Sequence, residues 1–398
     1  MKKLIIYIIL LSFTFSSCSK PNKQNIENDK NATHNKKIIA TWVTYEEIKM
    51  LIDATNSKND FINLIYEKLN VLKNYKVNTI FLHVRAFDDC FYKSDIYPVS
   101  IYCSNKDGSL KYDVLEIFIN ICKLLDIKLH AWVNPYRIRN DSAINKINEN
   151  TLAYKFINNK SEKIIITENV IYYNPAYVDI QKYIIDGIKE ILENYSVDGI
   201  HIDDYFYPTT STMIDNSIFT SYTVSGGKLS LNDFRRRNID SLISSIYSLV
   251  KSYGDICFSI SPNGDINKNY NVLFADVKKW LKEDGYVDYI IPQIYYGYEN
   301  ADMPFKSVIN EWIHEDNSKI IIGLGLYKSG KKDNYAKSGE NEWIFNYDII
   351  SRQIKDVYRN NYAGLSVFSS LLLTNKSDNS ILEKEKINII KTMEIYET

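Results

Sequence analysis

Apolar and polar positions follow two alternating rhythms along this chain. From Lys37 onward, short runs rich in β-branched residues alternate with longer stretches whose apolar residues recur every three or four positions. The first pattern is typical of strands and the second of amphipathic helices, as in Phe61-x-x-Leu64-Ile65-x-x-x-Leu69-x-x-Leu72. Eight such strand-and-helix units follow one another, and repeated units of this kind build parallel sheets.

The eight units predict an α/β fold, a single (β/α)8 TIM barrel over residues 38–398. The predicted strands are Ile38–Thr44, Asn78–Arg85, Lys128–Asn134, Val197–Asp203, Asp255–Ser261, Tyr286–Tyr295, Lys319–Leu326 and Tyr362–Ser369. The predicted helices are Asn63–Tyr75, Tyr112–Leu125, Tyr177–Tyr195, Leu231–Tyr253, Ala275–Glu283, Phe305–His314, Asp348–Arg359 and Leu382–Met393.

The main alternative is a doubly wound open sheet. It would place a glycine-rich phosphate turn after an early strand, but neither G-x-G-x-x-G nor G-x-x-x-x-G-K-[ST] occurs in the chain. No cofactor is predicted. The long connections 86–111, 135–176, 205–230 and 262–273 all follow predicted strands. In a barrel this gathers the long loops on the face that carries active sites.

The first twenty residues have the layout of an export signal. Two lysines precede an apolar stretch that is short for a membrane span, followed by small residues and Cys18. The end of this stretch, F-S-S-C, resembles a bacterial lipobox. We therefore expect a lipoprotein signal peptide over 1–17, lipidation of Cys18 and a flexible polar tether over 18–37. The alternatives are an uncleaved anchor or an ordinary signal peptide, and in each case the folded part is exported.

Composition narrows the set of partners. The 48 Lys and Arg balance 49 Asp and Glu, for a net charge of -1, so the chain has no basic field for nucleic acid. Apart from Cys18, the cysteines match no metal-binding spacing. Cys90 and Cys103 could form a loop disulfide, whereas Cys122 and Cys257 lie in apolar patterns typical of buried thiols. No metal site is predicted.

The segment 196–208, S-V-D-G-I-H-I-D-D-Y-F-Y-P, ends the fourth predicted strand with two carboxylates. Because successive strand side chains face opposite ways, His201 and Asp203 project to one face and Ile200 and Ile202 to the other. Strand ends are where α/β barrels place catalytic residues. The structural alternative, a turn or helix-capping role, is weaker for Asp203 than for Asp204.

The same alternation assigns an inward, mostly polar set to the strand ends. It comprises His83, Arg85, His130, Trp132, Asn134, His201, Asp203, Ser259, Ser261, Gln293 and Tyr295. Such a cluster is costly in a core unless it is hydrogen-bonded or lines a solvated pocket, so we predict a site there. His83 alone is better explained as a core residue. A metal-dependent hydrolase that uses His130, His201 and Asp203 is a weaker alternative.

Glycoside hydrolysis fits this set of residues, because it needs two carboxyl groups, and aromatic rings and planar amides hold sugars. Neither G-x-S-x-G nor H-E-x-x-H occurs. We expect Asp203 to be an essential carboxylate, with Asp204 or Asp89 as its partner. Since neighbours on a strand diverge, a partner from another loop is favoured. The predicted substrate-binding residues are Arg85, His130, Trp132, Asn134, Arg137, His201, Tyr205, Gln293, Tyr295 and Tyr296.

Six segments in order resemble the glycosyl-hydrolase-like 10 family: F-L-H-V-R-A-F-D-D-C-F-Y-K-S-D (81–95), L-H-A-W-V-N-P-Y-R (129–137), Y-N-P (173–175), 197–208, I-S-P-N-G (260–264) and V-D-Y-I-I-P-Q-I-Y (287–295). The resemblance implies a TIM-barrel glycoside hydrolase that is exported or lipid-anchored, in a family with members implicated in cleaving peptidoglycan glycan strands. It implies site positions at Arg85, Asp89, His130, Asn134, Arg137, Asp203, Asp204 and Gln293. Ala86 and Asp88 depart from the family pattern V-R-P-x-G-D.

The expected protein is a lipid-anchored glycoside hydrolase of the bacterial cell envelope. Its expected substrate is a polysaccharide, with peptidoglycan glycan strands as the specific candidate. The alternative, from another functional class, is a lipoprotein that binds a glycan in the barrel pocket without turnover.

Overall fold

The computed structural model describes residues 37–313 and 317–397. The predicted signal peptide, the lipidation site Cys18 and residues 18–36 of the predicted tether lie outside this part of the chain. Among the described residues, no helix has both the length and the apolar character needed to cross a membrane.

Eight parallel strands form the barrel, as the alternation predicted. In chain order they are β1 (Ile38–Val43), β2 (Thr79–Arg85), β3 (Lys128–Val133), β7 (Gly199–Ile202), β8 (Cys257–Ile260), β9 (Tyr289–Ile290), β10 (Ile321–Leu324) and β11 (Gly364–Val367). The hydrogen-bonded order is β10-β11-β1-β2-β3-β7-β8-β9. Parallel bridges from Ile290 to Ile320 and from Gln293 to Gly323 join the two ends of this sheet, so the barrel closes.

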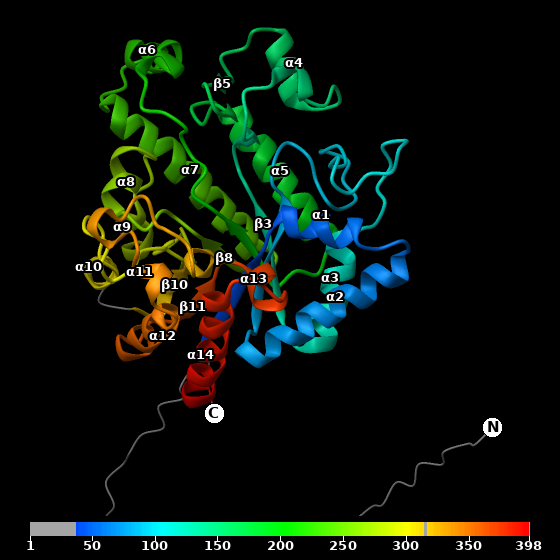
Figure 1. The fold of residues 1–398 in the computed structure, drawn as a ribbon. Helices are drawn as coiled ribbons and strands as arrows, with labels where there is room; N and C mark the ends of the chain where they lie inside the picture. The colour runs from blue at the N-terminus through cyan, green and yellow to red at the C-terminus, as the bar shows by residue number, and fades with distance from the viewer. Residues whose placement is uncertain (1–36, 314–316, 398) are drawn as a thin grey trace, which may run out of the picture. The chain divides into compact units, whose positions relative to one another are not determined.

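Helices follow the strands and cover the outside of the barrel (Figure 1). Eight of the described helices match the predicted ones: α2 (Lys58–Leu72), α3 (Val114–Leu125), α5 (Val178–Asn194), α7 (Leu231–Ser252), α9 (Val277–Lys282), α10 (Phe305–Glu311), α12 (Ile349–Arg359) and α14 (Ser380–Tyr396). α2 begins five residues earlier than predicted, because the Ser57 side chain caps it by accepting a hydrogen bond from the backbone N–H of Asp60. The (β/α)8 fold class is therefore confirmed.

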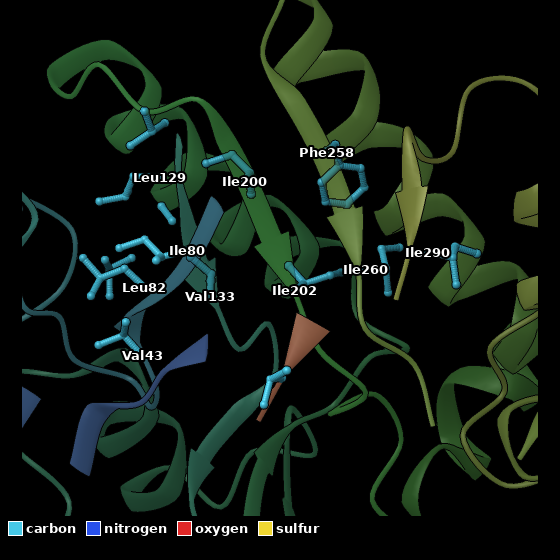
Figure 2. Close-up of a cluster of buried hydrophobic side chains, with 14 of the residues drawn as sticks. Val43, Ile80, Leu82, Leu129, Val133, Ile200, Ile202, Phe258, Ile260 and Ile290 are labelled. Atoms are coloured by element: carbon cyan, nitrogen blue, oxygen red, sulfur yellow. The ribbon is translucent and has the colours of Figure 1, made fainter. Parts of the chain in front are cut away.

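Side chains on the strands separate into two cores. The outward positions, including Val43, Ile80, Leu82, Leu129, Val133, Ile200, Ile202, Phe258, Ile260 and Ile290, pack in the large core between barrel and helices (Figure 2). A small second core fills the barrel interior with Ala40, Trp42, Phe81, Trp132, Ile291 and Ile321. The remaining interior positions are polar, so the inside of the barrel contains the hydrogen-bonded groups that position the site.

The loops after the strands contain structure that periodicity did not reveal. Between β3 and α5, the strands β4 (Arg137–Arg139), β5 (Ile164–Ile166) and β6 (Ile171–Tyr173) form an antiparallel sheet in the order β4-β6-β5, accompanied by α4 (Leu152–Asn158). The other helices outside the prediction are α1 (Tyr45–Asp53), α6 (Asn216–Val224), α8 (Ile266–Asn271), α11 (Glu342–Phe345) and α13 (Ser370–Thr374). Figure 1 shows α4, β5 and α6 at the end of the barrel opposite to the end of α14 that carries the C-terminus.

The cysteines of the barrel are not paired in this structure. Cys90, Cys103, Cys122 and Cys257 are free thiols. Cys90 and Cys103, for which a loop disulfide was considered, are both buried, and the Sγ atom of Cys103 lies 3.7 Å from the backbone oxygen of Cys90. They pack as small apolar groups in the loop after β2.

Gly199 gives a test of packing inside the barrel. A Cβ atom at this position would lie 2.5 Å from Cγ of the His130 ring on the neighbouring strand. Overpacking a rigid interior costs about 1 to 3 kcal/mol, so we expect Gly199→Ala to lower the free energy of unfolding by about that amount in urea titrations. The matched control is the double variant with His130→Ala, which opens the space. If Gly199→Ala were equally destabilising in both backgrounds, the clash with His130 would not be the cause.

Candidate active site

Asp203 lies at the carboxyl end of β7, where the chain leaves the barrel. Its side chain is buried, and Oδ2 accepts a hydrogen bond of 3.1 Å from Nε1 of Trp132 on β3. Burial raises the pKa of Asp203 to about 8, and the neighbouring Asp204 adds to the shift, while Arg137 opposes it. A carboxyl group with this pKa is mostly protonated at neutral pH. The structure therefore provides a carboxylic acid at the mouth of the barrel.

Asp204 also lies at this mouth, but its side chain points toward the residues that follow β8 rather than toward β3. It is partly exposed, and Nδ2 of Asn263, which follows β8, lies 3.5 Å from its Oδ2. Burial also raises the pKa of Asp204, whereas contacts with Asn263, Lys268 and Gln293 lower it. The donors around Asp204 thus favour its ionised form and oppose the effect of burial on its pKa.

Arg137 brings a positive charge to the same mouth. Its guanidinium lies 4.0 Å from the ring centroid of Tyr205 and 4.9 Å from that of Phe87. Its Nε donates to the backbone oxygen of Ala86 at 3.1 Å, and the Asn134 side chain donates to the same oxygen at 2.9 Å. The two predicted binding residues Asn134 and Arg137 therefore also hold the loop after β2 in place.

Aromatic residues form the opposite rim of the mouth. Tyr295 and Tyr296 follow β9 and are partly exposed. Tyr295 packs edge-on against Tyr327 at 5.7 Å, and its pKa is raised by burial and by nearby charges that include both Asp203 and Asp204. Trp132, Asn134, Arg137, Tyr205, Gln293, Tyr295 and Tyr296 thus lie with Asp203 and Asp204 at the mouth.

His201 occupies a deeper layer than predicted. It is fully buried, its Nε2 accepts a hydrogen bond of 3.1 Å from the Trp42 indole, and its Nδ1 lies 2.8 Å from the Ser259 hydroxyl. Because an indole only donates, Nε2 carries no proton and Nδ1–H donates to Ser259. Both ring nitrogens are therefore used within the barrel. The structure thus places His201 inside the barrel, below the mouth.

His130 also lies below the mouth. Its ring packs edge-on against Phe81 at 5.5 Å and fills the space beside Gly199. Burial lowers its pKa to about 3, so the ring is neutral at physiological pH. The structure places the His130 side chain in the barrel interior, below the surface of the mouth. His83 stacks on Trp132 at 3.6 Å, which agrees with its interpretation as a core residue.

Arg85 departs from the predicted inward orientation because β2 contains an irregularity. The pairing with β3 shifts between His83 and Arg85, so Arg85 pairs with the outward-facing Val133. Such a bulge turns the next side chain to the other face. The Arg85 guanidinium accordingly lies 4.7 Å from the Tyr97 ring centroid and donates to the Pro135 oxygen at 3.3 Å. It supports the loops rather than lining the mouth.

Asp88 and Asp89 are located in the loop after β2. Asp88 is buried and accepts hydrogen bonds from the hydroxyls of Tyr173 on β6, at 2.6 Å, and Tyr183 on α5, at 3.1 Å. Asp88, which departs from the family pattern, therefore joins the loop after β2 to β6 and α5. Burial raises the pKa of Asp89 to about 7, and its Oδ1 is buried without a hydrogen-bond partner. Asp89 faces a separate loop pocket with Ile101 and Arg139.

Sequence reasoning missed several residues around the mouth. Phe87 stacks on Arg137, Tyr172 of β6 faces Tyr205 at 6.4 Å, and Asn263 approaches Asp204. Strand alternation could not find them, because all three lie outside the barrel strands. The position of Asn263 directly after I-S-P, at a strand end, is the signal that could have identified it.

Among residues 37–313 and 317–397, no group of three or more His, Cys, Asp or Glu side chains is arranged to hold a metal ion. The three residues of the metal-dependent alternative, His130, His201 and Asp203, belong to successive layers of the barrel. Nε2 of His201 already accepts from the Trp42 indole. This side-chain arrangement does not match a metal site.

The fold is a (β/α)8 barrel with two carboxyl groups at its mouth. The structure is similar to the PgaB (BpsB) glycoside hydrolase domain from Bordetella bronchiseptica, with a TM-score of 0.54 and 9% identity over 88% of this chain and 98% of that one. It is also similar to the catalytic domain of a β-amylase from Paenibacillus polymyxa, with a TM-score of 0.53 and 9% identity over 89% of this chain and 98% of that one. At these identities the likeness concerns the fold.

Residues 37–344 match the family model "Glycosyl hydrolase-like 10", and the chain belongs to that family. Two relatives are glycosyl hydrolase YngK of Bacillus subtilis, 26% identical over 79% of this chain and 65% of its own length, and glycosyl hydrolase DigH of Escherichia coli K12, 27% identical over 70% and 68%. The chain thus spans about two thirds of these relatives. The family resemblance seen in the sequence motifs is confirmed.

The buried acid predicts a pH-dependent stability. Because the pKa of Asp203 is raised in the folded state to about 8 from 3.8, the folded chain binds a proton that the unfolded chain releases between these values. Its stabilising contribution is present below pH 3.8 and is lost as the pH rises through about 8. We therefore expect Asp203→Asn to raise the thermal midpoint relative to wild type more at pH 8 than at pH 5. The exposed Asp95→Asn is the control, and equal shifts at both pH values would contradict the assignment.

Proposed function

We propose that this protein hydrolyses O-glycosidic bonds of a polysaccharide at the mouth of the barrel. The observation that supports this most strongly is a buried carboxyl group, Asp203, with a raised pKa beside a second carboxylate that has its own donors. Glycosidases need one carboxylic acid and one carboxylate flanking the bond. The membership of the glycosyl hydrolase-like 10 family supports the same reaction class.

In the proposed mechanism, Asp203 acts as the general acid. It gives its proton to the oxygen of the leaving sugar as the bond between the anomeric carbon and that oxygen breaks. Asp204 serves as the partner carboxylate, either by accepting a proton from the attacking water or by attacking the anomeric carbon itself. Arg137 opposes the raised pKa of Asp203 and stabilises the carboxylate that forms when the proton leaves.

The binding surface beside the carboxyl groups suits a sugar polymer. Tyr205 and Tyr295 supply flat rings with polar tips, and the side chains of Gln293 and Asn263 supply planar amides that match hydroxyl groups. We propose peptidoglycan glycan strands as the substrate, which the family resemblance suggests, and a location in the bacterial cell envelope through a lipid on Cys18. The export layout of the first twenty residues supports this location.

Substitution of the acid tests the mechanism. Loss of a positioned general acid costs about 10²- to 10⁴-fold in rate, so we expect Asp203→Asn to lower kcat by that range in an assay of released reducing ends. In wild type, kcat/KM should fall as the pH rises through about 8, where Asp203 loses its proton. Asp95→Asn, which alters an exposed carboxyl of the loop after β2, is the matched control and should retain wild-type activity.

The outcomes separate an enzyme from a binding protein. An Asp203→Asn variant as active as wild type would refute the central assignment. If wild type released no product from any glycan while wild type, Asp203→Asn and Asp204→Asn all bound the glycan, the result would support the alternative of a non-catalytic glycan-binding lipoprotein.

A substrate panel tests the proposed polymer. We expect wild type to release reducing ends from peptidoglycan strands stripped of their stem peptides, and to release far fewer from strands that keep them. The reason is that Asp203 and Arg137 are both buried, so that a peptide branch beside the scissile bond would meet the side chains that cover them. Equal activity on both preparations would contradict this expectation, and activity only on unrelated polysaccharides would exclude peptidoglycan.

A further inference from the structure

A second hollow lies in the loops beside the mouth. It is formed by the loop after β2 together with the β4 region and encloses about 540 Å³, in part open to solvent. We call it the Asp89 pocket, and the residues that the argument uses are Phe87, Asp89, Tyr102, Arg139, Asn140 and Asn148.

The Asp89 pocket combines apolar surface with amide and carboxyl groups, and two cationic side chains, Arg139 and Lys146, also line it. The Arg139 guanidinium is paired with Asp141 through two contacts of 2.7 Å. Asn140 and Asn148 supply amides, and Asp89 supplies a carboxyl group whose Oδ1 atom is shielded from solvent. A sugar ring with hydroxyl and acetamide groups matches the amides, the carboxyl group and the apolar surface of this pocket.

A continuous strip of rings connects the Asp89 pocket with the catalytic mouth. The Arg137 guanidinium lies between Tyr205 at the mouth, at 4.0 Å, and Phe87, at 4.9 Å. Tyr45 then packs against Phe87 at 5.1 Å and against Tyr102 at 5.5 Å. Phe87 and Tyr102 both line the pocket. The strip of contacts therefore runs from Tyr205 at the mouth to the pocket, through the buried side chains of Arg137 and Phe87.

We propose that the Asp89 pocket is a distal subsite that binds a neutral sugar unit of the same glycan whose bond is broken at Asp203. This inference rests on the proposed function, because it assumes that the mouth accepts a glycan. It reassigns Asp89 from the second catalytic carboxylate to a ligand for a sugar hydroxyl or acetamide group. It also makes the protein selective for chains long enough to extend along the strip.

Glycans of different length distinguish binding at the subsite from bond cleavage at the mouth. The probes are peptidoglycan strands without stem peptides, cut to two and to six sugars, and kcat/KM is measured for each. We expect wild type to prefer the hexasaccharide. Tyr102→Ala removes one ring from the pocket, so it should lower kcat/KM for the hexasaccharide about two- to tenfold, which is the usual effect of an aromatic contact. The loss should be smaller for the disaccharide, because both of its sugars flank the bond that is broken at Asp203.

Two further variants show whether the ring itself acts. Tyr102→Phe keeps the ring and should restore most of the preference, and Tyr335→Ala, which removes a tyrosine that is 89% exposed outside the pocket, should retain it. Thermal midpoints of all variants are compared, because Tyr102 also packs on Tyr45. If Tyr102→Ala lowered kcat/KM equally for both lengths, or for neither, the proposed subsite would be refuted.

Titration calorimetry distinguishes the failure of this inference from the failure of the proposed function. Should wild type hydrolyse neither strand, tighter binding of the hexasaccharide than of the disaccharide, lost in Tyr102→Ala, would support the subsite while the hydrolase assignment failed. Equal affinity for the two lengths in wild type would refute the subsite, even if the hydrolase were active.

Discussion

Burial of one carboxyl group at the end of β7 is the constraint on which the site depends. A carboxylate taken out of water is costly unless donors surround it, and Asp203 has one indole donor and a stacked arginine nearby. It therefore keeps its proton, which makes it suitable as an acid. The surrounding structure maintains this state, since Trp132 is fixed on β3 and Arg137 is fixed by the backbone of the loop after β2. The fold thus raises the pKa of Asp203 chiefly by burying its carboxyl group.

Strand alternation predicted the fold and much of the mouth, because it depends only on the twofold repeat of the strand. It could not specify depth. At about 3.3 Å per residue, His201 lies roughly 7 Å below Asp203, and His130 about 13 Å below Asn134. Both histidines have the inward orientation that was predicted, yet both are enclosed. Alternation also gave the wrong orientation for Arg85. The pairing of β2 with β3 shifts there, so the Arg85 side chain turns to the outer face of the barrel. Nothing in the sequence V-R-A indicates such a bulge.

The loops escaped prediction for a different reason. Their strands β4, β5 and β6 have three residues each, too few for a periodic signal, and they are held by side chains distant in sequence. Asp88 shows this, because its partners Tyr173 and Tyr183 lie 85 and 95 residues further along the chain. The carboxylate of Asp88 departs from the family pattern, and only the three-dimensional structure shows that the Tyr173 and Tyr183 hydroxyls bind it. The loop that carries Asp88 also carries Phe87 and Asp89, so the same anchor holds the wall of the mouth and the floor of the Asp89 pocket.

The adjacency of Asp203 and Asp204 looked unfavourable for a catalytic pair, because neighbours on a strand diverge. In the structure the two side chains do diverge, but this divergence is compatible with a catalytic pair. β7 ends at Ile202, so both carboxyl groups belong to the loop that crosses the mouth. Asp203 turns toward β3 and the Trp132 indole, while Asp204 turns toward the residues after β8 and β9. Divergence therefore gives two adjacent groups different donors, and different donors favour different protonation states. Two adjacent carboxyl groups with different donors, one of them with a pKa of about 8, suit the proposed acid-assisted cleavage of a glycosidic bond.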